Sequence, residues 1–90
     1  MKPKHPMTAH GDHLTIRERK LGREQAHGQY WPKKRLIELD SRLDNRQCLI
    51  TIVHEAIHDA MPYLVEEEVT AKAKMIAKSV WAVGYRRICK

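Results

Sequence analysis

Large side chains and cysteines are scarce in this chain. Its 90 residues include no phenylalanine, two tryptophans, three tyrosines and two cysteines. A chain of this length and composition can build one small aliphatic core, near the lower limit for a domain that folds unaided. A metal ion that binds only the folded chain would stabilise such a domain. We therefore expect a single domain whose folding benefits from a bound ion.

The sequence also lacks membrane and export signals. No apolar run reaches the length of a membrane span, and no signal-peptide pattern is present. Cys48 and Cys89 do not belong to a C-x-x-C pair and are expected to be reduced thiols. These features favour the cytoplasm and exclude a membrane partner from the expected interactions.

Positive charge is in excess. The net charge is +6 and the isoelectric point is about 9.6. Basic residues cluster at 33–35 and again at 86–90. A basic surface favours contact with polyanions, most simply nucleic acid, although a solvated basic surface without a partner has the same composition.

The first part of the chain predicts a tail and a small sheet. Residues 1–13 have no apolar periodicity and are expected to form a mobile tail, leaving 14–90 as the single domain. Residues 14–21 alternate weakly, 32–34 resemble a turn, and Arg35–Asp40 is the best candidate strand. We expect two or three antiparallel strands within residues 14–40.

The second part of the chain predicts two helices. Asp44 is the expected N-cap of the first helix, with Gln47 at the third position, and the helix ends near Pro62. Its expected core stripe is Leu49, Ile52, Val53, Ala56 and Ala60. The second helix is expected from Val65 to Val83, ended by Gly84. Its expected stripe is Val69, Ala73, Ile76, Val80 and Val83. The predicted fold class is α+β, a small antiparallel sheet followed by two packed helices.

The motif H-E-x-x-H lies within the first predicted helix, as His54, Glu55 and His58. Positions four residues apart lie on the same side of a helix, so the two imidazoles can converge on one metal ion. Glu55 projects about 100° round the helix from His54, close enough to act on a water without being a ligand. This arrangement is typical of zinc hydrolases.

A third ligand is expected from the acidic first turn of the second helix. Glu66 projects toward the first helix, whereas Glu67 points nearly opposite, so Glu66 is favoured and Glu67 is kept as the alternative. Acidic residues also stabilise a helix N-terminus through its dipole without any metal. With two histidines and one glutamate, Zn²⁺ would have an open fourth position.

These residues predict a peptidase mechanism. Glu55 would act as the general base, taking a proton from the attacking water and delivering it to the leaving amine. An extended peptide or protein substrate could pair with the edge of strand 35–40. Tyr63, Tyr85 and Arg86 are candidate oxyanion donors, each with a structural role as its alternative. Trp81 and Tyr85 are expected to pack in the core and at the helix end.

The residues that follow the H-E-x-x-H motif are more distinctive than the motif itself. The chain continues as Pro62-Tyr-Leu64-Val-Glu66-Glu67-Glu-Val69 and later as Trp81-x-x-Gly84-Tyr85-Arg86. Residues 36–86 resemble small metallopeptidase-like proteins encoded by phages and prophages, and more distantly minigluzincins, SprT-like and ImmA/IrrE-like domains. The resemblance implies a minimal zincin fold, zinc at His54 and His58, and a glutamate ligand at Glu66 or Glu67. It implies no particular substrate.

Two other functions are compatible with the sequence. The first is a basic module associated with nucleic acid, in which the zinc site is structural or accessory. The second is a metal hydrolase that acts on RNA, but no third histidine follows His58. The residues specify no oligomeric state.

Overall fold

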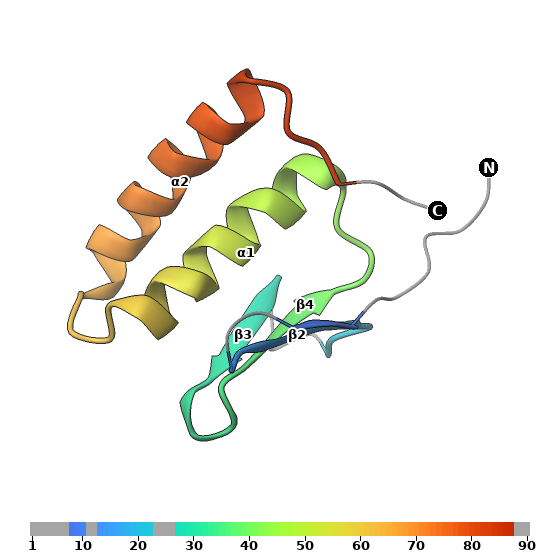
Figure 1. Ribbon diagram of the computed structural model, residues 1–90, viewed down its shortest axis with the longest axis vertical. Helices are drawn as coiled ribbons and strands as arrows, with labels where there is room; N and C mark the ends of the chain where they lie inside the picture. The colour runs from blue at the N-terminus through green and yellow to red at the C-terminus, as the bar shows by residue number, and fades with distance from the viewer. Residues whose placement is uncertain (1–7, 11–12, 23–26, 88–90) are drawn as a thin grey trace.

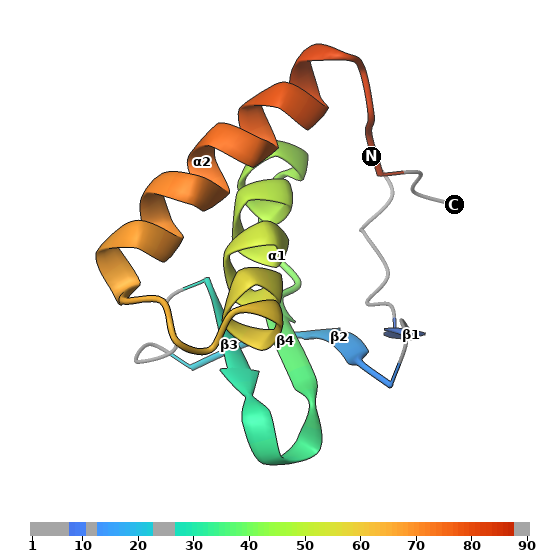
Figure 2. The same ribbon diagram turned by 60° about the vertical axis from the view of Figure 1, so that its left-hand side comes forward.

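The computed structural model describes residues 8–10, 13–22 and 27–87 of the chain (Figure 1). The elements are β1 (Thr8–His10), β2 (Thr15–Arg19), β3 (Gly28–Trp31), β4 (Leu36–Asp40), α1 (Asn45–Ala60) and α2 (Glu66–Ala82). The sheet forms one layer, α1 covers it, and α2 packs on the outer side of α1 (Figures 1 and 2). The predicted α+β class, a small sheet followed by two packed helices, is confirmed.

The sheet has four strands in the order β1-β2-β4-β3. The β1–β2 and β3–β4 pairs are antiparallel, but β2 and β4 are parallel. The sheet is therefore mixed, whereas the sequence predicted two or three antiparallel strands. Strand β3 has only four residues and begins with Gly28-Gln29, which have weak strand propensity, so its position in the sheet was not predicted. The parallel pairing of β2 with β4 was missed for that reason.

The predicted tail overlaps the sheet. Thr8–His10 lies within residues 1–13 and pairs with β2 through Thr8–Arg17, Ala9–Ile16 and His10–Thr15. This part of the expected tail is a strand. Residues 1–7 and 11–12 lie outside the described residues, as does Cys89.

Strand β4 is an interior strand of the sheet, paired with β2 on one side and β3 on the other, and α1 packs against it. All five of its residues are buried, and Ile37 and Leu39 pack with Cys48 of α1 in one cluster of the core. The prediction that 35–40 offers a free edge was wrong, because β2 and β3 pair with both sides of β4. Among the described strands, the edge near α1 that has no partner belongs to β3. Arg35 precedes the strand with a φ of 45° and follows the short 3-10 helix η2 (Pro32–Lys34), which confirms the predicted turn.

The capping of α1 agrees with the sequence. The Asp44 side chain accepts a hydrogen bond of 2.7 Å from the backbone N–H of Gln47, satisfying one of the free donors at the helix start. The Gln47 side chain contacts Nδ1 of His27 at 3.0 Å instead of returning to the cap. The cap therefore fixes the start of α1, and Gln47 links that start to the segment before β3.

The predicted core stripe of α1 is displaced. Its buried residues are Cys48, Thr51, Glu55 and Ile57, whereas Ala60 is exposed and the other predicted residues are half-buried. The reason is that α1 packs on two opposite sides. Ile52 and Ala56 contact the sheet cluster, and Val53 contacts the cluster shared with α2. The predicted stripe lies on the flank between these two contact surfaces.

Helix α2 packs through small residues. Val69 and Ala73 are fully buried, as predicted, and Ala77 is 2 % exposed. Ile76 and Val83 were predicted to be in the stripe but are 43 % and 72 % exposed. Since α1 is the element that covers α2, only the narrow row at positions 69, 73 and 77 is buried.

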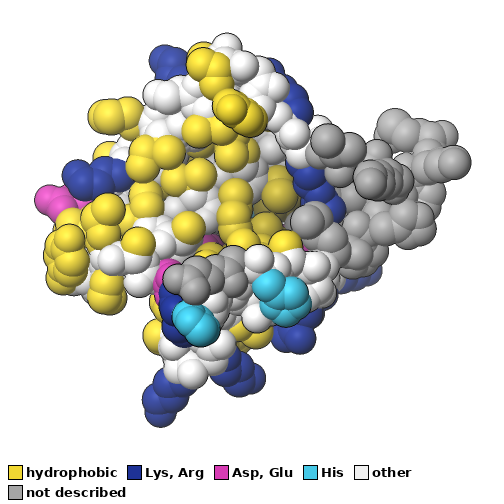
Figure 3. Space-filling view, in the orientation of Figure 1, with side chains coloured by type: hydrophobic (Ala, Val, Ile, Leu, Met, Phe, Trp, Pro, Cys, Tyr) yellow, Lys and Arg dark blue, Asp and Glu magenta, His cyan; other side chains and the backbone are white. Residues whose placement is uncertain are grey.

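Hydrophobic side chains spread over the two helices on the face seen in Figure 3. Met75, Ile76, Val83 and Tyr85 are among the exposed large ones. Among the described residues, no helix is both long enough and apolar enough to span a bilayer.

Candidate metal centre

Helix α1 carries the three residues of the motif on one flank, as the sequence predicted. The rings of His54 and His58 lie with their centroids 5.1 Å apart at an interplanar angle of 62°. Both are partly buried, and they project away from the sheet cluster formed by Cys48, Ile52 and Ala56. The spacing of four residues therefore produces two adjacent imidazoles that face a common region.

Glu66, the first residue of α2, completes the cluster. Its Oε1 lies 2.6 Å from Nε2 of His54, and its Oε2 lies 2.8 Å from Nε2 of His58. The turn over residues 61–65 reverses the chain between the helices and brings the first turn of α2 beside the last turn of α1. The structure thus brings together the favoured glutamate and both histidines, whereas the alternative, Glu67, is not in this cluster.

The donor set fits a divalent cation. One ligand atom from each of His54, His58 and Glu66 lies within 4.8 Å of the other two. In a tetrahedral zinc site, bond lengths of about 2.0–2.2 Å place neighbouring ligand atoms roughly 3.3–3.5 Å apart. Small side-chain rotations from the observed contacts reach this spacing. Two imidazoles and one carboxylate also match the ligand preferences of zinc, and three protein ligands leave a fourth position open.

Glu55 lies beside the cluster without joining it. Its Oε1 is 4.0 Å from Nε2 of His54, and the residue is 9 % exposed. Burial raises the pKa of the Glu55 carboxyl, and positive charge on His54 and His58 acts in the opposite direction. A buried carboxyl with a raised pKa, next to side chains that could hold a metal ion, has the properties of a group that accepts and returns a proton.

An open cleft of about 460 Å³ adjoins this cluster. Its lining residues come from β3, from the turn after β3, from α1 and from the start of α2: Gly28, Gln29, Tyr30, Pro32, Glu55, His58, Pro62 and Glu66. One wall is therefore the edge of β3 that pairs with no other described strand, and the candidate metal ligands His58 and Glu66 lie opposite. An extended chain that paired with this edge would pass directly over Glu55 and His58.

A polar network, not anticipated from the sequence, fixes β3 against α1. The Tyr30 hydroxyl donates to Asp59, and Arg35 donates to the same carboxylate through Nε at 3.1 Å and Nη2 at 2.7 Å. These bonds lower the pKa of Asp59, the Arg35 pair being the larger cause, and the bond to Asp59 raises the pKa of Tyr30. The only sequence signal was that Asp59 directly follows the second histidine.

The predicted oxyanion donors do not line this cleft. Tyr63 is 78 % exposed, and Tyr85 is 72 % exposed at the opposite end of α2. Arg86 stacks on the Trp81 ring at 3.4 Å and donates to the carbonyl oxygens of Trp81 and Tyr85. The expectation of a packed Tyr85 was wrong, and only Trp81 is half-buried. Tyr30 is the tyrosine that lines the cleft.

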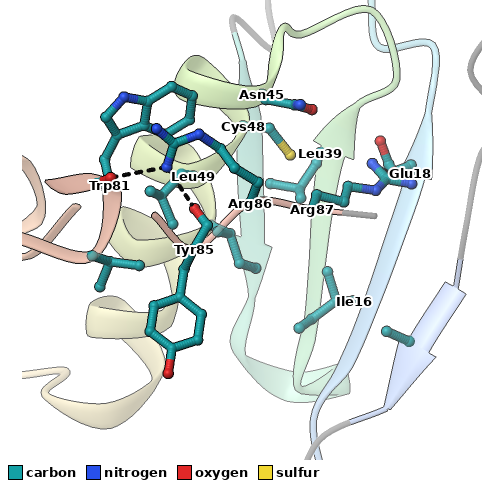
Figure 4. A pocket seen from close by; sticks show the side chains of 13 residues that line it. Ile16, Glu18, Leu39, Asn45, Cys48, Leu49, Trp81, Tyr85, Arg86 and Arg87 are labelled. Carbon is teal, nitrogen blue, oxygen red and sulfur yellow. Dashed lines mark hydrogen bonds and ion pairs between the residues drawn. The ribbon is translucent and has the colours of Figure 1, made fainter. Parts of the chain in front are cut away.

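A second cavity of about 270 Å³ lies on the other flank of α1 (Figure 4). Apolar side chains such as Ile16, Leu49 and Ile52 line it, and an ion pair of 2.5 Å between Arg87 and Glu18 closes one end. None of the metal-cluster residues lines this cavity. The cluster of His54, His58 and Glu66 and this cavity therefore lie on different flanks of α1.

No protein-family model, curated protein or solved structure matches this chain.

Proposed function

We propose that the protein is a zinc-dependent metallopeptidase of the minimal zincin kind. The observation that carries the proposal is the convergence of His54, His58 and Glu66, with their ligand atoms within 4.8 Å of one another and Glu55 adjacent. When bound there, zinc supplies a Lewis acid and lowers the pKa of a coordinated water. His54, His58 and Glu66 would hold the ion.

Glu55 performs the proton transfers in the proposed reaction. It accepts a proton from the water that attacks the peptide carbonyl, and it then donates that proton to the nitrogen of the leaving amine. The carboxyl is nearly buried and lines the cleft where the substrate binds. Burial favours its neutral form after proton uptake, which suits the second transfer.

Strand β3 is the element best placed to hold the substrate. Its outer edge has no partner strand among the described residues, and Gly28, Gln29 and Tyr30 line the cleft. An extended peptide that adds to this edge forms backbone hydrogen bonds without regard to its side chains. A peptide bound in this way would have a carbonyl beside Glu55 and the proposed metal ligands.

The openness of the site favours catalysis over a structural zinc site in a nucleic-acid-associated module. Structural zinc sites are closed by four protein ligands. Here the described residues provide three ligands beside an open cleft, and the Glu66 side chain is 64 % exposed. A position for water and substrate is thus available.

Glu55→Gln is the decisive variant because it keeps the shape of the side chain but removes the base. With zinc loaded, we expect hydrolysis of a denatured protein mixture to fall by roughly 10²–10⁴-fold while zinc content stays at one ion per chain. Zinc content is read by metal analysis and cleavage by mass spectrometry. Equal cleavage by wild type and variant would refute the assignment of Glu55, and a wild-type chain that binds zinc without cleaving any peptide would support a structural site.

A further inference from the structure

The side of the helix pair that carries the metal cluster also carries a second group of charged residues. On α1, Arg46, Ile50, His54 and His58 follow one another at intervals of four residues. Residues at this interval form one slowly winding row along a helix. The histidines occupy the end of the row near the loop between the helices, and Arg46 occupies the other end.

A facing row runs along α2. Glu66, Thr70, Lys74 and Lys78 are also four residues apart, and α2 is antiparallel to α1. Glu66 contacts the histidines, whereas Lys74 and Lys78 line a cavity of about 230 Å³ together with Arg46 and Trp81. The two rows thus define one face with the metal ligands at one end and a basic group at the other.

Two arginines lie over an aromatic ring beside these lysines. Arg46 lies 5.6 Å from the centroid of the Trp81 ring, and Arg86 lies 3.4 Å from it. Together with Lys74 and Lys78 these residues form the basic cluster. They come from three segments of the chain, the start of α1, the middle of α2 and the residues after α2.

The charges of the basic cluster are not neutralised within the described part of the chain. Other arginines are paired with carboxylates, as Arg17 and Arg19 are with Glu38 and Arg35 is with Asp59. Among the described residues, no carboxylate forms an ion pair with any member of the basic cluster. A concentrated, uncompensated positive charge attracts an anionic partner.

A substrate peptide bound along β3 would extend toward the basic cluster. Strand β3 runs beside α1 in the same direction, because His27 contacts Gln47 at its start and Tyr30 contacts Asp59 at its end. Gln47 is adjacent to Arg46. A peptide extended along β3 from the metal cluster therefore travels along α1 toward its N-terminus and the basic cluster.

The distance between the metal cluster and the basic cluster predicts how far the recognised substrate residue lies from the cleaved bond. His54 is eight residues from Arg46, and Glu66 is eight residues from Lys74, which is about 12 Å along each helix. An extended peptide covers this distance in about four residues. We infer that the basic cluster binds acidic side chains of the substrate about four or five residues from the cleaved bond, so the enzyme selects acidic peptides.

This inference rests on the proposed function, since it concerns the substrate of the same site. An acidic peptide fits better than a nucleic acid because the basic cluster is a local group, centred on its own cavity of about 230 Å³, on the face of the helix pair that also carries the metal cluster. Nucleic acid needs cations spaced along its backbone. Other cations lie elsewhere, such as Lys33 and Lys34 on the turn after β3.

A peptide library tests the inference. Zinc-loaded protein is incubated with a proteome-derived peptide mixture, and the cleaved bonds are identified by mass spectrometry. We expect Asp and Glu to be enriched four or five residues from the cleaved bond, on one side only. We expect the double variant Lys74→Glu, Lys78→Glu to lose this enrichment and to raise KM for an acidic substrate by roughly tenfold, with little change in kcat.

The matched control is Lys20→Glu, Lys72→Glu. Both lysines are exposed, Lys20 follows β2, and Lys72 lies on the other flank of α2. The two double variants have the same net charge, so only the position of the change differs. We expect the control to keep the wild-type preference and KM. An equal loss in both double variants would overturn the inference, because overall charge would then explain it.

A binding measurement separates the inference from the proposed function. Zinc-loaded Glu55→Gln is titrated with a fluorescein-labelled glutamate-rich peptide, a lysine-rich peptide and a single-stranded DNA oligonucleotide. Preference for the glutamate-rich peptide, lost with Lys74→Glu, Lys78→Glu, supports the basic cluster as an acidic-peptide site even if no cleavage is found. Cleavage without acidic enrichment overturns the inference and leaves the peptidase intact. Tighter binding of DNA than of the glutamate-rich peptide, with the same dependence on Lys74 and Lys78, replaces the peptide with nucleic acid.

Discussion

The hydroxyl of Tyr30 donates a 2.5 Å hydrogen bond to Oδ1 of Asp59, which joins the edge strand β3 to the last turn of α1, the helix that carries His54 and His58. Tyr30→Phe removes this bond and leaves the ring in place. A hydrogen bond to a charged group contributes about 1.5–3 kcal/mol, so we expect the free energy of unfolding to fall by roughly 2 kcal/mol. Urea denaturation measures it.

The control for this substitution is Tyr85→Phe. Tyr85 is 72 % exposed, so loss of its hydroxyl should change the free energy of unfolding by less than about 0.5 kcal/mol. If Tyr30→Phe were equally neutral, the contribution of the polar network at Asp59 to stability would come from Arg35.

Glu66 and Glu67 are adjacent acidic residues with different predicted contributions to metal binding. Glu66 contacts both histidines, whereas Glu67 is exposed and outside the cluster. We expect Glu66→Ala to weaken zinc binding by roughly 100-fold, since even residues behind the ligands change affinity by about 10–100-fold, and Glu67→Ala to leave it nearly unchanged. Competition with a chromophoric chelator measures both affinities.

Zinc should also stabilise the wild-type chain against thermal unfolding, because an ion that binds only the folded state shifts the equilibrium toward it. Glu66→Ala should lose most of this shift, and Glu67→Ala should retain it. The opposite ranking would assign the third ligand to Glu67.

Gly28 is a position where space forbids a side chain. A Cβ there would lie 2.7 Å from Cγ2 of Thr51 and 2.9 Å from the carbonyl oxygen of Glu38. We expect Gly28→Ala to cost about 1–3 kcal/mol of folding free energy, because β3 would have to move away from α1 and β4. Thermal unfolding measures the loss.

A second substitution distinguishes the two contacts of Gly28. Thr51→Ser removes Cγ2 but keeps the hydroxyl that donates to the carbonyl oxygen of Gln47 at 2.8 Å. Combined with Gly28→Ala, it should recover part of the lost stability, and a double-mutant cycle measures the coupling. Strict additivity would show that the contact with the Glu38 backbone alone determines the cost.

The lowered pKa of Glu38 predicts how the free energy of unfolding depends on pH. Hydrogen bonds from Arg19, Trp31 and Arg17 lower the pKa of this buried carboxyl from 4.5 to about 2. The group binds a proton more readily in the unfolded chain, so its contribution is fully present above about pH 4.5 and is lost as the pH falls toward 2. Glu38→Gln should reduce the free energy of unfolding by roughly 2 kcal/mol at pH 7 and flatten its dependence on pH between 4.5 and 2.

Urea denaturation of wild type and Glu38→Gln at pH 7, 4 and 2.5 measures this difference. The two curves should converge toward the acidic end. Parallel curves would show that Glu38 has the same pKa in the folded and unfolded chains. Asp40, whose pKa Arg42 lowers to about 2, adds a similar acid dependence to both proteins and cancels in the comparison.

The clustering of His54, His58 and Glu66 was predictable because its geometry is local. The interval from His54 to His58 fixes their shared side once the segment is helical, and the Asp44 cap marks where that helix begins. The prediction that Glu66 joins the cluster needed one further step, because a short turn makes the second helix pack antiparallel to the first. Each of these inferences needed only residues close in sequence.

The walls of the site depend on distant residues and were not predictable. Tyr30 and Asp59 are 29 residues apart, and no pattern in either segment indicates that they meet. The core stripe of α1 was misplaced for a similar reason. A helix covered on two opposite sides has two partial stripes, and periodicity alone combines them into one. Glu55 and Thr51 are buried because β3 and β4 lie beside them, which the sequence of α1 does not indicate.

The sheet order β1-β2-β4-β3 has a consequence for how the chain folds. Strand β4 follows β2 and β3 in the sequence but lies between them, so the sheet cannot assemble in the order of synthesis. Only η2 and Arg35 separate β3 from β4, so this hairpin closes at low entropic cost and can form early. Strand β2 can pair with β1 at once but has to wait for β4 on its other side, so the wall of the cleft formed by β3 can take shape before the sheet is complete.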